Sequence, residues 1–449
     1  MKAVFTLSLC AALAAPAQAQ LRLPQLPGMP RLPGIADRVL PQPLPELLSS
    51  ATQLVDLRLS TVRELLARHR DLVEADPAGE PIRRQELVLV SPSHAALAAA
   101  AELGLARLRE EAWPELDLRE VVLRVPAGLD TAQALARLRA AQPGLQADFN
   151  HLYSRSGEVA AAAAAAQSGA QPGPLRVGLV DGGVDRRHAA LRHAAGASFG
   201  CDGRALPSEH GTAVASLLVG HDRGFAGAAS KAELFAADVY CEQPDGGSAE
   251  EVVRALAWMA RERVAVVNIS LVGPQNRLLE QGVAALVKRG HLLVAAVGND
   301  GPAAPPLYPA SYAGVVGVTG VSPGRRVLPE AAQGPQVMWS APGADVAVAR
   351  SGGGYGIARG TSFAAPLVAG LLAAELRAPD VAAAAAAVDK LATGAVDLGA
   401  PGRDPVYGRG LVAEELRVVP EQLQQRQARL HKSFQVRREG SSGGGRCTR

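Results

Sequence analysis

From Pro174 to Glu415 the sequence alternates short β-branched runs with amphipathic segments, and this alternation limits the fold more than any other feature. Strands separated by helices are typical of a parallel sheet with helices on its faces. We predict strands at Arg176–Val180, Ala232–Tyr240, Val264–Ile269, His291–Val297 and Val315–Val321, and helices at Gly211–Val219, Ala249–Arg263, Leu278–Arg289, Phe363–Leu376 and around Ala382–Ala387. The sequence therefore predicts an α/β domain over residues 174–416, a mostly parallel sheet flanked by helices.

A smaller unit precedes this domain. Its predicted elements are a strand at Leu87–Val90, a helix at His94–Glu111, a strand at Arg119–Val125, a helix at Thr131–Ala141 capped by Asp130, and a strand at Leu145–Tyr153. This order indicates a compact α+β domain over residues 85–153, and it contains no dense cluster of catalytic residue types. Residues 154–173 are rich in Ala and Gly, so we expect an exposed linker that is open to cleavage.

The N-terminal residues have the features of a secretory signal at 1–19. Met1-Lys2 supplies a charged start, Ala3–Ala15 is apolar, and Ala17-Gln18-Ala19 supplies small residues before a cleavage site. The apolar run is too short to span a bilayer, so we expect a secreted or periplasmic protein without a membrane span. Residues 20–84 form a Pro/Leu-rich leader with a helical segment, whose start at Thr61 and Glu64 fits a capping box.

The composition is that of a globular protein with about two folded units, since 449 residues carry 48% apolar and 20% charged side chains. The formal net charge of +3 is small, and many basic residues fall in the tail at 417–449, which we expect to lack fixed structure. This charge balance favours no nucleic-acid partner. We expect a monomer.

The chain has four cysteines. Cys10 leaves with the signal and Cys447 lies in the tail, while Cys201 and Cys241 both fall in the α/β domain. In an oxidising compartment these two can form a disulfide, and the alternative is two unpaired buried thiols. No His/Cys cluster has zinc spacing, so we predict no metal site.

Four polar residues stand at predicted strand ends or helix starts of the α/β domain. Asp181 ends a strand, His210 opens His-Gly-Thr, Asn299 follows the strand His291–Val297, and Ser362 lies in Gly-Thr-Ser-Phe-Ala-Ala-Pro. Each alone has an ordinary explanation as a helix cap, a structural histidine or a turn residue. Together they supply a nucleophile, a general base, a carboxylate to orient the base and an amide donor for an oxyanion.

Two other classes of protein share some of these features. A nucleotide-binding α/β protein would use the Gly-rich turn after Val180, but it leaves His210, Asn299 and Ser362 unexplained. A non-catalytic binding protein on a peptidase scaffold remains an alternative, although the complete set of four residues argues against it.

These motifs resemble those of the subtilisin-like serine peptidases, whose Asp, His, Ser order is the one found here. The resemblance covers about Pro174–Glu415 and includes Asn268-Ile269-Ser270-Leu271, Tyr308-Pro309-Ala310, Ser340-Ala341-Pro342-Gly343 and Tyr407-Gly408-Arg409-Gly410. It implies a subtilisin-like fold and a secreted serine endopeptidase that hydrolyses peptide bonds through an acyl-enzyme. Asp181, His210 and Ser362 would be its catalytic triad, with Asn299 in the oxyanion hole.

The same resemblance implies a self-processing zymogen. Residues 85–153 resemble the inhibitory propeptide domain of the family, which makes the chain's own propeptide its intramolecular inhibitor beside its protein or peptide substrates. We expect the cut in the Ala-rich stretch Val159–Ala170. The short segment Gly220–Gly224 carries one acid, so calcium dependence is not supported and no cofactor is expected.

The resemblance also implies the substrate-binding residues, namely Ser270, Leu271 and Val272 as a strand that pairs with substrate, with Gly298 and Leu307 at the specificity pocket. Three positions depart from the family pattern. Gly182 replaces a usual Ser or Thr, Val272 a common Gly, and Leu307 a Gly found in some relatives. The last two favour a shallow pocket for small side chains.

Overall fold

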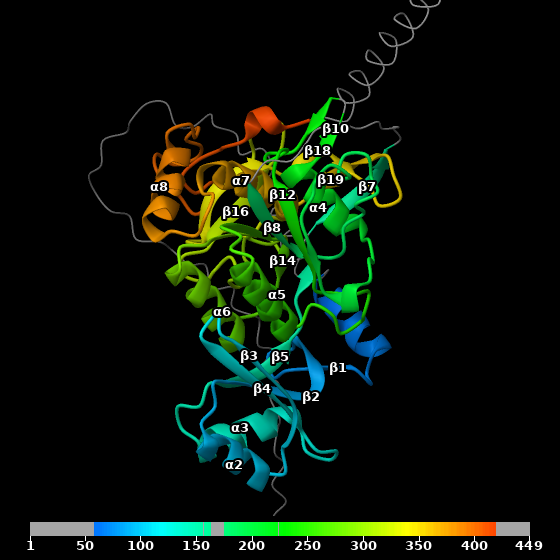
Figure 1. Ribbon diagram of the computed structural model, residues 1–449, viewed down its shortest axis with the longest axis vertical. Coiled ribbons are helices and arrows are strands. Elements are labelled where there is room, and N and C mark those ends of the chain that lie inside the picture. Colours follow the sequence, from blue (N-terminus) through cyan, green and yellow to red (C-terminus); the bar gives the residue numbers. More distant parts are fainter. Residues whose placement is uncertain (1–57, 156, 163–174, 223, 419–449) are drawn as a thin grey trace, which may run out of the picture. The chain divides into compact units, whose positions relative to one another are not determined.

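The computed structural model describes residues 58–155, 157–162, 175–222 and 224–418, with backbone only at 160–162 (Figure 1). The predicted signal, most of the leader, part of the linker and all but the first two residues of the predicted tail lie outside the described residues. No helix among the described residues is long and apolar enough to cross a membrane.

The α/β domain is built on a seven-stranded sheet in which all pairings are parallel, as predicted. The strand order is β17-β16-β15-β13-β8-β12-β9. The strands are β8 (Arg176–Asp181), β9 (Ser198–Phe199), β12 (Glu233–Asp238), β13 (Val266–Ile269), β15 (Leu292–Ala296), β16 (Val316–Val321) and β17 (Val337–Pro342). All five predicted strands are confirmed, and β9 and β17 are additional.

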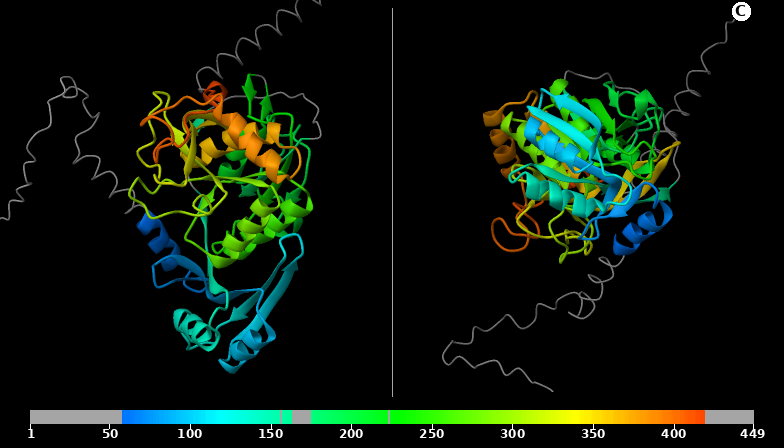
Figure 2. Two further views of the ribbon diagram at one scale, coloured as in Figure 1. Left: turned by 90° about the vertical axis from the view of Figure 1, so that its left-hand side faces the viewer. Right: turned by 90° about the horizontal axis from the view of Figure 1, so that it is seen from below.

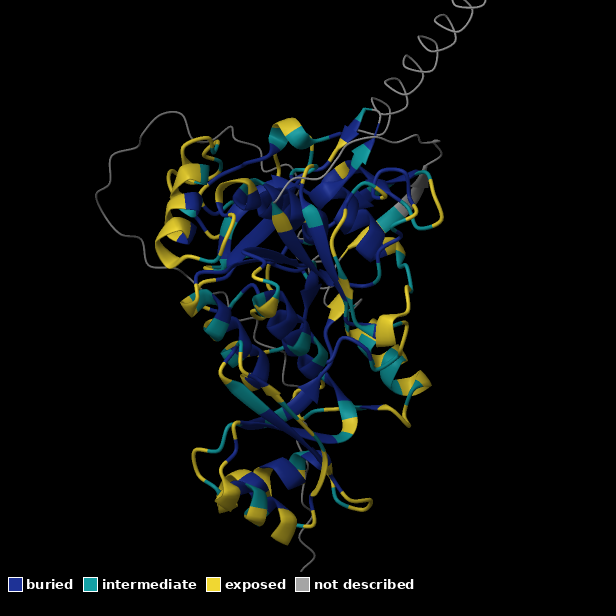
Figure 3. Ribbon diagram, in the orientation of Figure 1, coloured by how far each residue is buried: buried dark blue, intermediate teal, exposed yellow. Residues whose placement is uncertain are grey.

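Helices cover both faces of this sheet (Figure 1). They are α4 (Glu209–Val219), α5 (Ala249–Arg261), α6 (Arg277–Lys288), α7 (Thr361–Glu375) and α8 (Val381–Ala392), so each predicted helix is confirmed. Because neighbouring residues of a strand face opposite sides, Leu179 packs in the core with α4 and α7, whereas Val180 packs with α5 and α6. Figure 3 shows α7 buried and α8 largely exposed.

The smaller domain is an antiparallel five-stranded sheet with two helices on one face (Figures 1 and 2). Its strands run in the order β1-β2-β4-β3, with β5 also pairing β2. The elements are β1 (Val73–Ala75), β2 (Pro81–Val90), α2 (His94–Glu102), β3 (Ala106–Trp113), β4 (Leu118–Arg124), α3 (Thr131–Ala141) and β5 (Ala147–His151). The predicted cap of α3 is confirmed, since the Asp130 side chain accepts from the backbone N–H of Gln133.

Three expectations for this part of the chain were wrong. The helix predicted at His94–Glu111 ends at Glu102, because Gly104 adopts a positive φ of 76° and the alternating residues after it pair with β4 as β3. Residues 58–68 are helical, so Thr61 lies within the helix rather than at its start. The domain also begins before residue 85, with β1 and the first half of β2.

The segment expected to be a free linker is paired where it is described. β6 (Ser154–Arg155) pairs antiparallel with β14 (Leu271–Val272), and β7 (Glu158–Ala162) pairs antiparallel with β19 (Tyr355–Arg359). β19 pairs in turn with β18 (Ala344–Ala349). The remaining short elements are β10 (His221–Asp222), β11 (Phe225–Ala226), η1 (Cys201–Gly203) and η2 (Glu414–Leu416).

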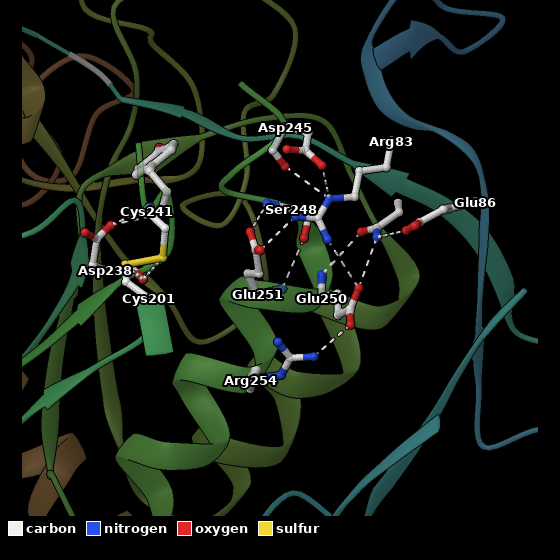
Figure 4. Close-up of polar contacts among 12 residues, drawn as sticks. Arg83, Glu86, Cys201, Asp238, Cys241, Asp245, Ser248, Glu250, Glu251 and Arg254 are labelled. Atoms are coloured by element: carbon white, nitrogen blue, oxygen red, sulfur yellow. Dashed lines mark hydrogen bonds and ion pairs between the residues drawn. A yellow bond between two sulfur atoms is a disulfide. The ribbon is translucent and has the colours of Figure 1, made fainter. Parts of the chain in front are cut away.

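The predicted disulfide between Cys201 and Cys241 is present, with the two Cα atoms 5.1 Å apart (Figure 4). It joins the segment after β9 to the loop after β12 across a sequence separation of 40 residues. In the chain-entropy model a loop of this length contributes about 4 kcal/mol of stability. These two sulfur atoms and the Asp238 carboxylate lie within 4.8 Å of one another, but the disulfide removes the thiolates that a metal ion would need.

Candidate active site

Asp181 and His210 are in direct contact at the carboxyl edge of the sheet. Asp181 is the last residue of β8 and is fully buried, and His210 is the second residue of α4. The Nδ1 atom of His210 lies 2.9 Å from both carboxylate oxygens of Asp181. Since a carboxylate only accepts, Nδ1 carries the proton, and the other ring nitrogen, Nε2, is the one placed to act as a base.

The position of His210 depends on a close approach between α4 and the turn after β8. The Ser208 side chain caps α4 by accepting from the backbone N–H of Gly211. A Cβ atom at Gly211 would lie 2.2 Å from the carbonyl oxygen of Gly182, so a side chain there would push the helix away from Asp181. The Gly of His-Gly-Thr is therefore required by packing.

Ser362 is the second residue of α7, which begins beside His210. The ring of Phe363 has its centroid 5.4 Å from that of the His210 imidazole. Ser362 is fully buried, and its Oγ has no hydrogen-bond partner among the described residues. An unpaired buried hydroxyl is costly in a structural role, which makes it a candidate nucleophile.

Pro366 and Ser270 together explain how α7 keeps its first turn. Pro366 has no N–H to donate to the carbonyl oxygen of Ser362, four residues earlier in the helix. The Ser270 hydroxyl donates to that oxygen instead, at 3.1 Å. Ser270 directly follows β13, the strand beside β8, so one strand end supports the start of the helix that carries Ser362.

Asn299 is held against the same helix start. Its Oδ1 accepts from the backbone N–H of Thr361 at 3.0 Å, and the backbone N–H of Gly298 donates to the Thr361 hydroxyl at 3.2 Å. Because Oδ1 is used in this way, the amide nitrogen Nδ2 is the donor turned toward the site. It lies 2.9 Å from where a Cβ atom at Gly360 would be, which places it beside the residues that precede Ser362.

The residues predicted to bind substrate line the same region. Leu271 and Val272 form β14, and both are buried. The Leu307 side chain is 1% exposed and lies against Gly298, with its Cδ1 atom 2.4 Å from a Cβ position there. Leu307 therefore occupies space beside the strand that leads to Asn299.

A cleft of about 430 Å³ lies over Asn299 and Gly360, and it is also lined by residues from before the α/β domain, including Arg58, Ser154 and Gly157. Burial raises the pKa of Asp300, and the nearby charge of Arg58 opposes that rise. Arg58 forms an ion pair with Asp300 at 3.0 Å. Neither Arg58 nor Arg155 stands out in the sequence, because only the folded chain brings them to the cleft.

Comparison with known proteins identifies the family. The family model described as the subtilase family matches residues 174–410, slightly more than half of the chain. Subtilisin from Bacillus pumilus is 30% identical over 253 residues, which cover 53% of this chain and 88% of that protein. The chain belongs to the subtilase family of serine peptidases.

Other relatives match over smaller shares of their length. Subtilisin E from Bacillus subtilis is 30% identical, with 53% of this chain and 64% of that protein covered. The minor extracellular protease Epr of the same organism is 30% identical over 45% of this chain, and the match spans only 32% of Epr. The crystal structure of fervidolysin from Fervidobacterium pennivorans superposes with a TM-score of 0.61 at 18% identity, covering 79% of this chain and 62% of that one. The structural match extends beyond residues 174–410 and shows a shared fold.

If Asn299 donates to an oxyanion, replacing it with Ala lowers kcat by about 10²–10³ with little change in KM, the range known for the equivalent donor in subtilisin itself. The measurement is steady-state hydrolysis of a peptide substrate by the matured enzyme. Asn299→Asp is the matched control, because it keeps an acceptor for the Thr361 N–H but loses the donor. Full activity in Asn299→Asp would mean that Asn299 only supports the helix.

Proposed function

We propose that this chain is a secreted or periplasmic serine endopeptidase, made as a zymogen that processes itself. The observation that carries the proposal is the Asp181–His210 contact at the carboxyl edge of the sheet, next to the helix start that presents Ser362 and to the docked amide of Asn299. Membership of the subtilase family supports the same chemistry. The apolar residues 3–15 and the small residues before Gln20 support export.

In the proposed mechanism the Ser362 hydroxyl oxygen attacks a peptide carbonyl carbon while Nε2 of His210 removes its proton. Asp181 keeps the imidazole in the Nδ1–H form and stabilises the imidazolium, without becoming protonated. The negative charge on the carbonyl oxygen is met by the Asn299 amide and the backbone N–H of Ser362. His210 then protonates the leaving amine. In the second half of the reaction His210 removes a proton from a water molecule, which attacks the carbonyl carbon of the acyl-enzyme, and His210 returns the proton to the Ser362 oxygen.

The segment β6 of this chain supports a substrate that binds as an extended strand paired with β14. Arg155 pairs with Leu271 and Ser154 with Val272, so β6 adds to β14 as a peptide substrate would. Further along the chain, Glu158 of β7 pairs with Arg359 of β19. Between these pairings Gly157 lies against the Ser362 helix, since a Cβ atom there would be 2.6 Å from the Phe363 ring. Arg155 on β14 and Gly157 beside Phe363 therefore both lie at the candidate catalytic centre, with one residue between them in the sequence.

The positions of Arg155 and Gly157 favour self-cleavage between Ser156 and Gly157, slightly before the stretch Val159–Ala170 expected from composition. The part of that stretch at 159–162 belongs to β7 and is held on β19 beyond the nucleophile, and residues 163–174 lie outside the described residues. The small α+β domain then acts as the propeptide. It reaches the α/β domain through side chains that meet the N-termini of α5 and α6.

At α6 the carboxylate of Asp148 accepts from the backbone N–H of Arg277, and the Asn276 amide donates to the carbonyl of Phe149. At α5 the Arg109 guanidinium bonds Glu86 of its own domain and Glu250 of the helix. The two domains also share one apolar core, in which Val88, Val122 and Trp113 pack with residues of α5 and α6. These contacts hold the propeptide on the helices beside the cleft.

Charged groups of both domains converge on this interface (Figure 4). Arg83 of β2 bonds Glu251 at 2.7 Å, and Arg254 of α5 bridges Glu250 at 2.8 Å and Glu111 of β3 at 2.8 Å. Glu120 of β4 is 1% exposed within this group, and its Oε1 has no hydrogen-bond partner among the described residues. The buried Glu120 carboxyl therefore has too few hydrogen-bond donors around it to stabilise its ionised form.

The first test of the proposal is the mature N-terminus. Wild-type protein is expected to start at Gly157 after maturation, and Ser362→Ala to stay uncut, because the cut needs the Ser362 hydroxyl. Ser351→Ala, which changes a serine in the turn between β18 and β19, is the matched control and should mature normally. N-terminal sequencing reads all three, and a processed Ser362→Ala would exclude self-cleavage by this residue.

A second prediction concerns the residue before the cleaved bond. With Leu307 against Gly298, and with Val272 in β14 where the family commonly has Gly, we propose a pocket for small side chains such as Ala or Ser. Leu307→Gly should raise kcat/KM for Phe at this position by about tenfold or more, because it opens space for the ring. A peptide-library profile of the wild type dominated by Phe, Tyr or Arg would contradict the proposal.

A third prediction is that the propeptide is released more readily as pH rises. Burial, with the charge of Glu250 adding to it, raises the pKa of Glu120 from 4.5 to about 9, while Arg109 and Arg254 oppose the shift and Glu111 reinforces it. A carboxyl whose pKa is higher in the complex than in the free propeptide binds a proton on association. The complex is therefore fully stabilised below about pH 4.5 and loses this stabilisation as pH rises toward 9, by up to tenfold in affinity per pH unit.

The measurement is the lag before peptide hydrolysis begins after self-cleavage, normalised to the final rate at each pH from 5 to 9. The wild-type lag should shorten with pH. Glu120→Gln mimics the protonated carboxyl and should keep a long lag with a weaker pH dependence. Equal slopes for the two proteins would show that Glu120 does not control release.

A further inference from the structure

We propose that this peptidase prefers substrates with Arg two residues before the cleaved bond and Gly directly after it. The inference rests on the proposed peptidase function and on the cut between Ser156 and Gly157. It identifies the substrate sequence that the cleft recognises, through Gly182, Tyr240 and Asp238 on one side of the cut and Phe363 on the other.

Arg155 lies in the cleft as a substrate residue would. Its backbone pairs with Leu271 of β14, and its guanidinium carbon lies 4.2 Å from the centroid of the Tyr240 ring. Tyr240 is 9% exposed and follows β12, so the ring is a fixed platform, whereas Arg155 as a whole is an exposed residue. A cation stacked on the face of an aromatic ring is attracted by the ring quadrupole, and Arg stacks better than Lys.

Gly182 makes room for this guanidinium. A Cβ atom at Gly182 would lie 2.7 Å from Nη2 of Arg155 and 2.5 Å from the Ser208 hydroxyl. The Ser or Thr usual at this position in the family would therefore require the Arg155 guanidinium or the Ser208 hydroxyl to shift. We infer that Gly182 departs from the family pattern because the absence of a side chain there leaves space for a large planar cation.

The subsite also lies in a negative field. The Asp238 carboxylate accepts the backbone N–H groups of Tyr240 and Cys241, both at 3.0 Å, which fixes it at the base of the loop that carries the ring. Burial raises the pKa of Asp238, and the positive charge of Arg155 acts against that rise, so the two charges interact. The second carboxylate, Asp181, lies next to Gly182 in the chain.

The residue after the cut meets the opposite restriction. Gly157 has a φ of 123°, a region that other residues rarely adopt, and its Cβ position lies 2.6 Å from Cε2 of Phe363 and 3.1 Å from the carbonyl oxygen of Arg359. Phe363 is fully buried against His210, so it has no space into which to move. Any side chain at this substrate position must shift the chain or the ring.

These subsites belong to the α/β domain and remain after the propeptide leaves. Gly182, Asp238 and Tyr240 stand at the ends of β8 and β12, and Phe363 follows Ser362. A foreign substrate therefore meets the same ring, space and carboxylate that Arg155 meets. The propeptide's own sequence, Ser-Arg-Ser-Gly-Glu, is in this view a model of the preferred substrate.

The test uses matured wild-type enzyme and quenched fluorescent peptides of the sequence Leu-Tyr-Ser-Arg-Ser-Gly-Glu-Val-Ala-Ala, which is that of residues 152–161. Mass spectrometry should place the cut between Ser and Gly. Replacing Arg with Ala should lower kcat/KM about five- to tenfold, Lys should fall between the two, and replacing Gly with Ala should lower it about tenfold or more. Ratios within twofold of one at both positions, or a cut at another bond, would overturn the proposal.

Two variants locate the arginine preference. Tyr240→Leu should bring the Arg-to-Ala ratio close to one, whereas Tyr240→Phe keeps the ring and should keep the ratio. Equal ratios in both variants would remove Tyr240 from the subsite. Hydrolysis of casein and labelling of Ser362 by a fluorophosphonate probe distinguish failure of the specificity proposal from failure of the proposed function. If the protein hydrolyses casein and is labelled but shows no preference for arginine, only the specificity proposal is wrong. If it does neither, the proposed peptidase function is wrong.

Discussion

The parallel pairing of β8, β13 and β15 is the constraint on which the rest of the site depends. Parallel strands end at the same edge, so Asp181, Ser270 and Asn299, which lie at or just after the ends of three neighbouring strands, are brought together although they are far apart in the chain. The helices α4 and α7 begin at this edge. Each contributes its second residue, His210 and Ser362, and small residues allow the close approach.

If the chain is made as the proposed zymogen, the same edge would explain how the precursor blocks its own site. A strand such as β14 that offers free backbone groups will pair with any extended chain, and the nearest extended chain is the segment that links the two domains. The sheet of the small domain and its charged contacts with α5 hold that segment in register. In the proposed zymogen, inhibition and substrate binding would therefore use the same interactions and differ in how long the bound chain stays.

The sequence was enough to predict the parallel sheet, its helices, the disulfide and the positions of the four polar residues at strand ends or helix starts, because each depends on local patterns or on short motifs. It was not enough to predict β3, since Ala106–Trp113 continues a helical run in composition and only Gly104 marks the break. The pairing of β7 with β19 was missed for another reason. An Ala-rich stretch has no strand pattern, and its partner lies about 200 residues away.

The surroundings of Arg155 and Glu120 were also beyond sequence reasoning. Both are ordinary charged residues in the chain, and what distinguishes them is what other segments bring near them. Tyr240 and Gly182 come from two different strand ends, and Glu250 comes from a helix of the other domain. The fold determines such long-range neighbours, and the spacing of residues in the sequence does not predict them.

The disulfide has a consequence for where the enzyme can be completed. Cys241 directly follows Tyr240, and Cys201 ties this loop to the segment after β9, so the platform beneath Arg155 is anchored by a covalent bond. Such a bond forms and persists in oxidising compartments and is rare in the reducing cytosol. If the proposed export and substrate preference hold, a molecule that folded before export would keep the Asp181–His210 contact but leave this loop untethered, so selectivity for the cleavage sequence would depend on the change of compartment.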